Sequence, residues 1–107
     1  MSATDTELVQ KLLNATTAGK VDWEPTGVTD QFKCTFSGKW MVTIDKGTDG
    51  DTAKNYFWLT MLNAKGSQLM QLFSTDVPYL PELFELARRR SLKIDDAIAD
   101  LLKELDK

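Results

Sequence analysis

Residues 31–45 read QFKCTFSGKWMVTID, and this stretch decides the fold. Apolar and polar side chains alternate before and after Ser37-Gly38-Lys39, a tripeptide typical of a tight turn. A period of two is typical of strands that bury one face. The stretch therefore predicts a hairpin with strands at about 31–36 and 39–46. On its second strand, one face is expected to carry Trp40, Val42 and Ile44, and the other Met41, Thr43 and Asp45.

Two further strands are predicted downstream of the hairpin. Residues 56–62 read YFWLTML, which is apolar on both faces and therefore typical of an interior strand. Residues 68–73 read QLMQLF and are expected to form the fourth strand. Because the connections are short, consecutive strands are expected to pair in antiparallel fashion. We predict a four-stranded antiparallel β-meander.

Helical spacing of apolar residues appears on both sides of the meander. A helix is predicted over about 5–18, where the stripe comprises Leu8, Val9, Leu12 and Leu13. A second is predicted over about 80–90, where the stripe comprises Leu80, Leu83, Phe84 and Ala87. The last is predicted over about 95–106, with a buried side comprising Ala97, Ile98, Leu101, Leu102 and Leu105. Residues 21–30 are expected to be a loop, with Trp23 packed on the core.

These elements predict one α+β domain over residues 1–107. Its order is an N-terminal helix, a four-stranded antiparallel meander and two C-terminal helices. The expected architecture has two layers, with the helices on one face of the sheet.

Composition excludes several kinds of active site. The 107 residues include no histidine and one cysteine, Cys34. Without histidine there is no imidazole acid or base, no catalytic triad and no histidine-ligated metal. One cysteine excludes an internal disulfide and a multi-cysteine zinc site. Cys34 lies mid-strand between Phe32 and Phe36, so we expect it to be a core residue. Together, these exclusions predict a protein that is not an enzyme and that has no cofactor.

The acidic loop at residues 45–51 departs from a calcium-binding loop. In an EF-hand alignment, Asp45 and Asp49 would take the first and fifth positions. The third position, however, is Gly47, and the twelfth is Tyr56, where a bidentate glutamate belongs. We expect a solvated hairpin tip and no metal.

Charge and hydropathy predict the location of the protein. Sixteen acidic and thirteen basic residues give a net charge of −3, which argues against general affinity for nucleic acid or anionic lipid. The first ten residues have no basic segment followed by an apolar run, so no signal peptide is predicted. The longest apolar run, residues 56–62, is too short to span a bilayer. We expect a cytoplasmic protein with no membrane partner.

The apolar character of residues 56–62 on both faces leaves two alternatives. Either the helices cover both faces of the sheet, or one apolar face is left for a partner. Methionine and aromatic residues are enriched in binding surfaces, and the candidate interface residues are Trp40, Met41, Tyr56 and Trp58. No motif identifies a more specific function. We predict a non-enzymatic protein–protein interaction domain, a homodimer or small adaptor, whose partner is itself or another protein.

Three arginines, Arg88, Arg89 and Arg90, end the second predicted helix. Their guanidinium groups could bind phosphates or an acidic partner. They could equally interact with the helix dipole and pair with Glu82 and Glu85 one turn back. The alternative function is therefore a DNA-associated regulator that uses Arg88–Arg90 and the C-terminal helix pair, although the acidic last helix would repel a nucleic-acid backbone.

The C-terminal quarter resembles a known DNA-binding family. Residues 82–105 read ELFELARRRSLKIDDAIADLLKEL and are similar to the helix pair that closes a ribbon–helix–helix repressor subunit. Two features depart from that family: the strand at 68–73 is mostly apolar, and Asp95 and Asp96 occupy the helix start where the family binds phosphate. The whole chain resembles small bacterial α+β proteins built as a helix, a four-strand meander and a helical hairpin. That likeness implies a stand-alone domain and supplies no functional residues.

Overall fold

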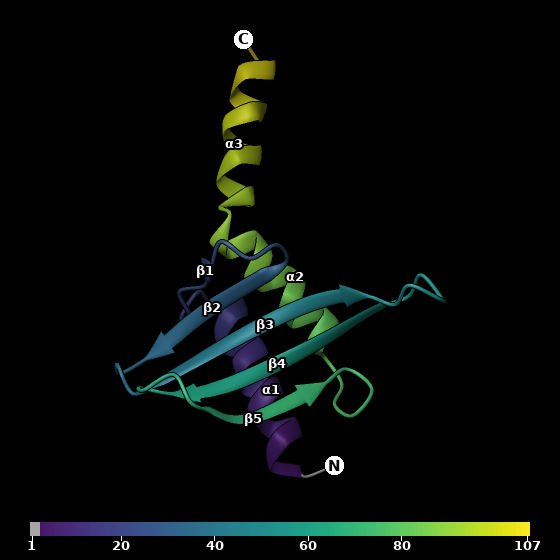
Figure 1. Ribbon diagram of the computed structural model, residues 1–107. Coiled ribbons are helices and arrows are strands. Elements are labelled where there is room, and N and C mark those ends of the chain that lie inside the picture. Colours follow the sequence, from purple (N-terminus) through teal and green to yellow (C-terminus); the bar gives the residue numbers. More distant parts are fainter. Residues whose placement is uncertain (1–2) are drawn as a thin grey trace.

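The computed structural model describes residues 3–107. In chain order its elements are α1 (Ala3–Thr17), β1 (Glu24–Pro25), β2 (Gln31–Phe36), β3 (Trp40–Thr48), β4 (Asn55–Asn63), β5 (Gln68–Phe73), α2 (Leu80–Ser91) and α3 (Ile94–Leu105). The strands form one antiparallel sheet in the order β1-β2-β3-β4-β5. Helices α1 and α2 lie on one side of it (Figure 1). The predicted α+β class and antiparallel sheet are confirmed.

The predicted number of strands is wrong, because the described chain has five rather than four. The additional strand β1 lies in the segment predicted to be a loop and pairs Glu24 with Lys33 at the edge of the sheet. Trp23 holds it there, since this side chain is buried and its indole nitrogen donates a hydrogen bond of 3.0 Å to the Thr16 hydroxyl. Pro25 lacks a backbone donor and is tolerated because β1 is an edge strand.

The hairpin of β2 and β3 turns at Ser37 and Gly38, whose φ angles are 56° and 66°. Two consecutive residues with positive φ are typical of a type I′ turn, whose twist matches that of the strands. The register that follows places one apolar row across four strands, in which Phe32, Ile44, Leu59 and Leu72 are cross-strand neighbours. All four are buried on the side of the helices. Among residues 3–107, no helix lies on the opposite side of β2–β5, which is called the open face below.

Helix α2 occupies the centre of the core. Its buried stripe comprises Leu80, Leu83, Phe84 and Ala87. The Phe84 ring lies 5.5 Å from the Phe32 ring and 5.4 Å from the Phe57 ring, measured between centroids. These aromatic contacts join α2 to β2 and β4, while α1 packs against α2 and buries Val9 and Leu12.

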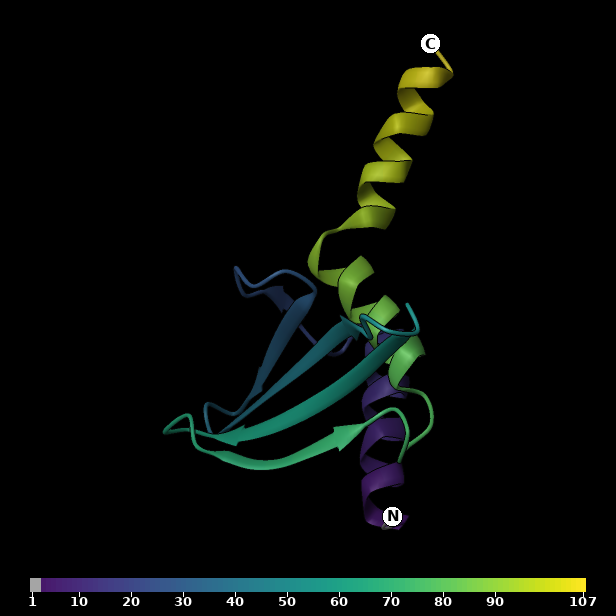
Figure 2. The same cartoon turned by 45° about the vertical axis from the view of Figure 1, so that its right-hand side comes forward.

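The predicted burial of the last helix is wrong. No residue of α3 is buried, and the predicted core side of this helix is exposed, namely Ala97, Ile98, Leu101, Leu102 and Leu105. The cause is Lys93, which adopts a left-handed conformation with φ 53° and ψ 43° between α2 and α3. This residue directs α3 away from the sheet, so the helical layer contains α1 and α2 (Figure 2).

Candidate functional site

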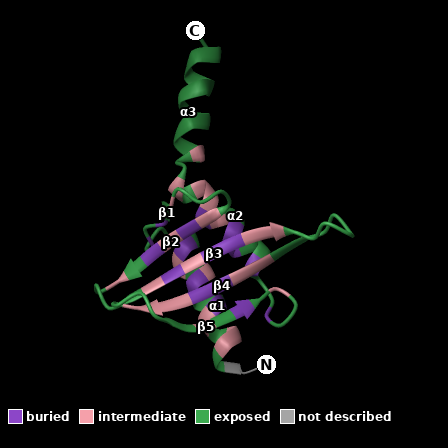
Figure 3. Ribbon diagram, in the orientation of Figure 1, coloured by how far each residue is buried: buried purple, intermediate pink, exposed green. Residues whose placement is uncertain are grey.

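Helix α3 presents an apolar stripe to solvent. We define the α3 apolar face as Ile98, Leu101, Leu102 and Leu105, which are 45%, 58%, 55% and 70% exposed. Their spacing of three and four residues places them on one side of the helix. Figure 3 shows that exposure continues along almost the whole of α3. A single exposed leucine is ordinary, whereas a contiguous exposed apolar stripe is a candidate binding surface.

The length of α3 strengthens this interpretation. The helix has 12 residues. Isolated helices shorter than about 12–15 residues are marginally stable in water, since most helical stability in proteins comes from packing an apolar face. A helix of this length with no buried residue would be stabilised by a second surface against which to pack.

The remaining surface of α3 is acidic. Over residues 94–107, the acidic side chains are Asp95, Asp96, Asp100, Glu104 and Asp106, against Lys103 and Lys107. Their charges sum to −3, the same as that of the whole chain. A partner surface for α3 is therefore expected to combine apolar side chains with a basic rim.

An apolar groove of about 310 Å³ lies between α1 and the sheet. We call it the α1–sheet groove; its apolar walls comprise Leu8, Leu12, Ala15, Phe36, Val42 and Met61. The two exposed residues that line it are Lys11 on α1 and Trp40 on β3. Its volume is at the lower end of the roughly 300–1,000 Å³ typical of ligand sites. The groove can accept a few apolar side chains.

The structure separates the four predicted interface residues. Trp40 lies on the helix side of the sheet and lines the α1–sheet groove, whereas Met41, Tyr56 and Trp58 lie on the open face. Tyr56 stacks on Trp58 with ring centroids 5.3 Å apart. The four residues therefore do not form one surface.

A polar row divides the open face. Lys33, Thr43, Thr60 and Gln71 are successive cross-strand neighbours from β2 to β5. This row separates the pair Met41–Leu62 from the pair Trp58–Phe73, which lie in the two flanking rows. Because the polar row interrupts its apolar side chains, the open face is a weaker candidate for a docking surface than α3.

Asp45 is a buried carboxylate on the open face and is 7% exposed. Its Oδ2 accepts a hydrogen bond of 2.8 Å from the Gln31 amide, and that glutamine in turn accepts one from Thr26. Oδ1 of Asp45 is buried without a hydrogen-bond partner among residues 3–107. Burial raises the pKa of this carboxyl above its ordinary value of 3.8, and the polar side chains of Gln31 and Thr43 oppose the shift. Leaving a polar atom unpaired in this way lowers stability.

Asp45→Asn is expected to raise the free energy of unfolding at pH 7 by about 1 kcal/mol, because a neutral amide loses less solvation on burial than a carboxylate. A carboxyl with a raised folded-state pKa binds its proton more tightly in the folded chain. Its destabilising effect is therefore absent below pH 3.8 and develops as pH rises through the folded-state pKa. The gain in the free energy of unfolding from Asp45→Asn should therefore be smallest below pH 3.8 and should increase as pH rises. Urea unfolding at several pH values would measure it.

The matched control for this substitution is Asp51→Asn in the exposed loop between β3 and β4, which is expected to change stability little at any pH. A loss of stability in Asp45→Asn at pH 7 would mean that the buried carboxylate makes a favourable contact, contrary to this account.

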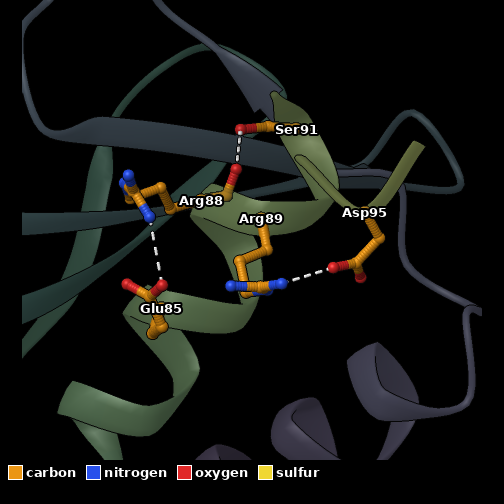
Figure 4. A network of polar contacts seen from close by, with 5 residues as sticks. All are labelled: Glu85, Arg88, Arg89, Ser91 and Asp95. Atoms are coloured by element: carbon orange, nitrogen blue, oxygen red, sulfur yellow. Dashed lines mark hydrogen bonds and ion pairs between the residues drawn. The ribbon is translucent and has the colours of Figure 1, made fainter. Parts of the chain in front are cut away.

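The three arginines of the cluster make contacts within the chain, and Figure 4 shows those of Arg88 and Arg89. Arg88 pairs with Glu85 at 3.0 Å, and Arg89 pairs with Asp95 at the start of α3. Arg90 donates a hydrogen bond of 3.1 Å to the Thr17 carbonyl at the end of α1. The first of these contacts is the predicted pairing with a glutamate one turn back, whereas the other two join α2 to its neighbouring helices.

Cys34 is 2% exposed and belongs to the core. Burial raises the pKa of its thiol to about 12, so the thiol is protonated at neutral pH. Because the thiolate is the reactive form, this cysteine is not a nucleophile. Within residues 3–107, no group of three or more histidine, cysteine or acidic residues could hold a metal ion.

The sequence contained a signal for the site that sequence reasoning missed. Ile94, Ile98, Leu101 and Leu105 are separated by four, three and four residues, the spacing of a helix that packs against another element along a narrow seam. Ile98, Leu101 and Leu105 of this stripe belong to the side of the helix that the sequence predicts to be buried, and Ile94 does not. The α1–sheet groove had no such signal, because its walls come from α1, β2, β3 and β4.

Comparison with family models, curated proteins and solved structures finds no match to this chain. The resemblances to ribbon–helix–helix repressors and to small bacterial α+β proteins therefore stay predictions. Among the helices of residues 3–107, none has the length and apolar character needed to cross a membrane.

Proposed function

We propose that this protein is a non-enzymatic protein–protein interaction domain that forms a homodimer through α3. The observation that carries the proposal is the α3 apolar face, four apolar side chains that are each 45% or more exposed on a helix with no buried residue. Burying such a stripe against a second chain removes apolar area from water, at roughly 25 cal/mol per Å². It also supplies the packing that a helix of this length needs.

The contacts of the three arginines support this proposal over the alternative of a DNA-associated regulator. Arg88 and Arg89 already have acidic partners, and Arg89 holds Asp95 at the start of an acidic helix. A phosphate backbone that approached Arg89 would meet this carboxylate as well. An acidic helix is better suited to a basic protein surface than to nucleic acid.

The experiment that tests the proposed function is the solution mass, measured by light scattering after size exclusion at low and high salt. We expect about 24 kDa, twice the 12.1 kDa of one chain. The dimer should persist at high salt, because salt screens charge pairs and does not weaken apolar contacts. A mass of 12.1 kDa at every concentration tested would contradict the proposal.

A further inference from the structure

We propose that α3 of one copy packs its apolar face into the α1–sheet groove of a second copy, and that α3 of the second copy packs in the same way into the groove of the first. This inference rests on the proposed homodimer and adds the surface that receives the helix. It assigns the groove as a docking site for a second copy of this chain.

The two surfaces match in chemistry. The α3 apolar face offers three leucines and Ile98, and the groove offers Leu8, Met61 and Phe36 as partly exposed walls above the buried Leu12. Methionine adapts its packing to a partner, and aromatic side chains contribute large contact areas. The groove is open to solvent at Trp40, which is 43% exposed, and tryptophan is the residue type most enriched among binding hot spots.

The two surfaces also match in charge. Lys11 lines the groove with a side chain that is 76% exposed, and Lys39 precedes Trp40 in the turn between β2 and β3. Lys65 lies near Lys39 in a neighbouring hollow at the same end of the sheet. These cations face an acidic helix of net charge −3. Lys11 pairs with Glu7 at 3.3 Å on the surface, and exposed pairs of this kind contribute about 0–1 kcal/mol.

Reciprocal exchange closes the assembly at two copies. Each copy contributes one helix and one groove, so a two-fold axis satisfies both and leaves neither exposed. Since the contact is made twice, each one needs to supply only half of the roughly 1,200–2,000 Å² that stable interfaces bury. A symmetric pairing of α3 with α3 would instead leave the groove empty and would bring two acidic helices together.

Disulfide cross-linking between singly substituted chains tests this arrangement. One chain carries Leu101→Cys on the α3 apolar face, and the other carries Trp40→Cys or Lys11→Cys at the groove. Each chain has one new thiol, so a mixed disulfide forms only between copies. Lys11 is exposed on α1, so its replacement should leave the fold intact. The native Cys34 stays in place, because it is buried and protonated.

We expect oxidation of the mixed chains to yield a disulfide-linked species of about 24 kDa containing one chain of each kind, identified by mass spectrometry. Thiols held together in the dimer have an effective concentration near millimolar, so the mixed disulfide should form at least about tenfold faster than with Lys103→Cys, the control on the polar side of α3.

Other outcomes would overturn the inference in different ways. Rapid linkage of Leu101→Cys to itself, without the mixed species, would show that two α3 helices pair with each other; the groove assignment would be wrong while the proposed homodimer stood. A dimeric mass with no linkage at either groove position would also overturn the groove assignment. A monomeric mass with no linkage would overturn both this inference and the proposed function.

Discussion

Replacing Leu101 by aspartate is expected to convert the homodimer into a monomer of 12.1 kDa. Leu101 is 58% exposed in the single chain and lies in the middle of the α3 apolar face. In the dimer the new carboxylate would be buried without a partner in both copies. Each should cost about 2 kcal/mol or more, as at other interface hot spots. The two together correspond to roughly a thousandfold weaker association, which light scattering at micromolar concentration would detect.

Ala99→Asp is the matched control, because it adds the same charge to α3 outside the apolar face. Both variants lower helix propensity to a similar extent, so a difference between them reports on the contact rather than on the helix. Dissociation of both variants to the same degree would mean that added negative charge, and not loss of the apolar face, disrupts the dimer. A dimeric Leu101→Asp protein would exclude α3 as the interface.

Replacing Phe84 by alanine is expected to lower the free energy of unfolding by about 3–5 kcal/mol. Phe84 is 4% exposed and touches the rings of Phe32 and Phe57, so its removal leaves a cavity where α2 joins the sheet. This loss is a large part of the 5–15 kcal/mol typical of a small domain. Urea denaturation monitored by circular dichroism would measure it.

Phe73→Ala makes the same substitution on the open face, where the ring is 40% exposed. We expect less than half of the Phe84→Ala effect, because less apolar area leaves water on folding and water can fill the space. Both variants should be compared at one protein concentration, since the stability of a dimer depends on it. Equal losses would contradict a core centred on α2.

Much of the sheet could be predicted from local pattern. The alternation in residues 31–45 correctly assigned Trp40, Val42 and Ile44 to one face and Met41, Thr43 and Asp45 to the other. Strand β1 could not be predicted, because Pro25 and Gly27 are typical of loops. Its pairing with β2 depends on the burial of Trp23 against α1, a tertiary contact that the pattern of residues 21–30 does not reveal.

The sequence predicted the apolar character of the candidate site but not the residues that form it. An excess of apolar surface was expected, but the residues chosen for it lie on two sides of the sheet, with Trp40 opposite Trp58. Asp45 shows the same limit, because strand alternation placed it on the polar face and its neighbours buried it there. Alternation tells which side of a strand a residue faces, and it does not tell what covers that side.

By itself, the sequence determined every helix and strand except β1, the antiparallel order of β2–β5 and the apolar stripe of every helix, because these depend on side-chain period and short connections. Only the tertiary structure decided which stripes are buried. The stripe of α2 meets the sheet, whereas the left-handed Lys93 turns the stripe of α3 away from it. Burial depends on two surfaces that meet. The pattern within one helix defines its apolar face, and the arrangement of the whole chain decides what that face packs against.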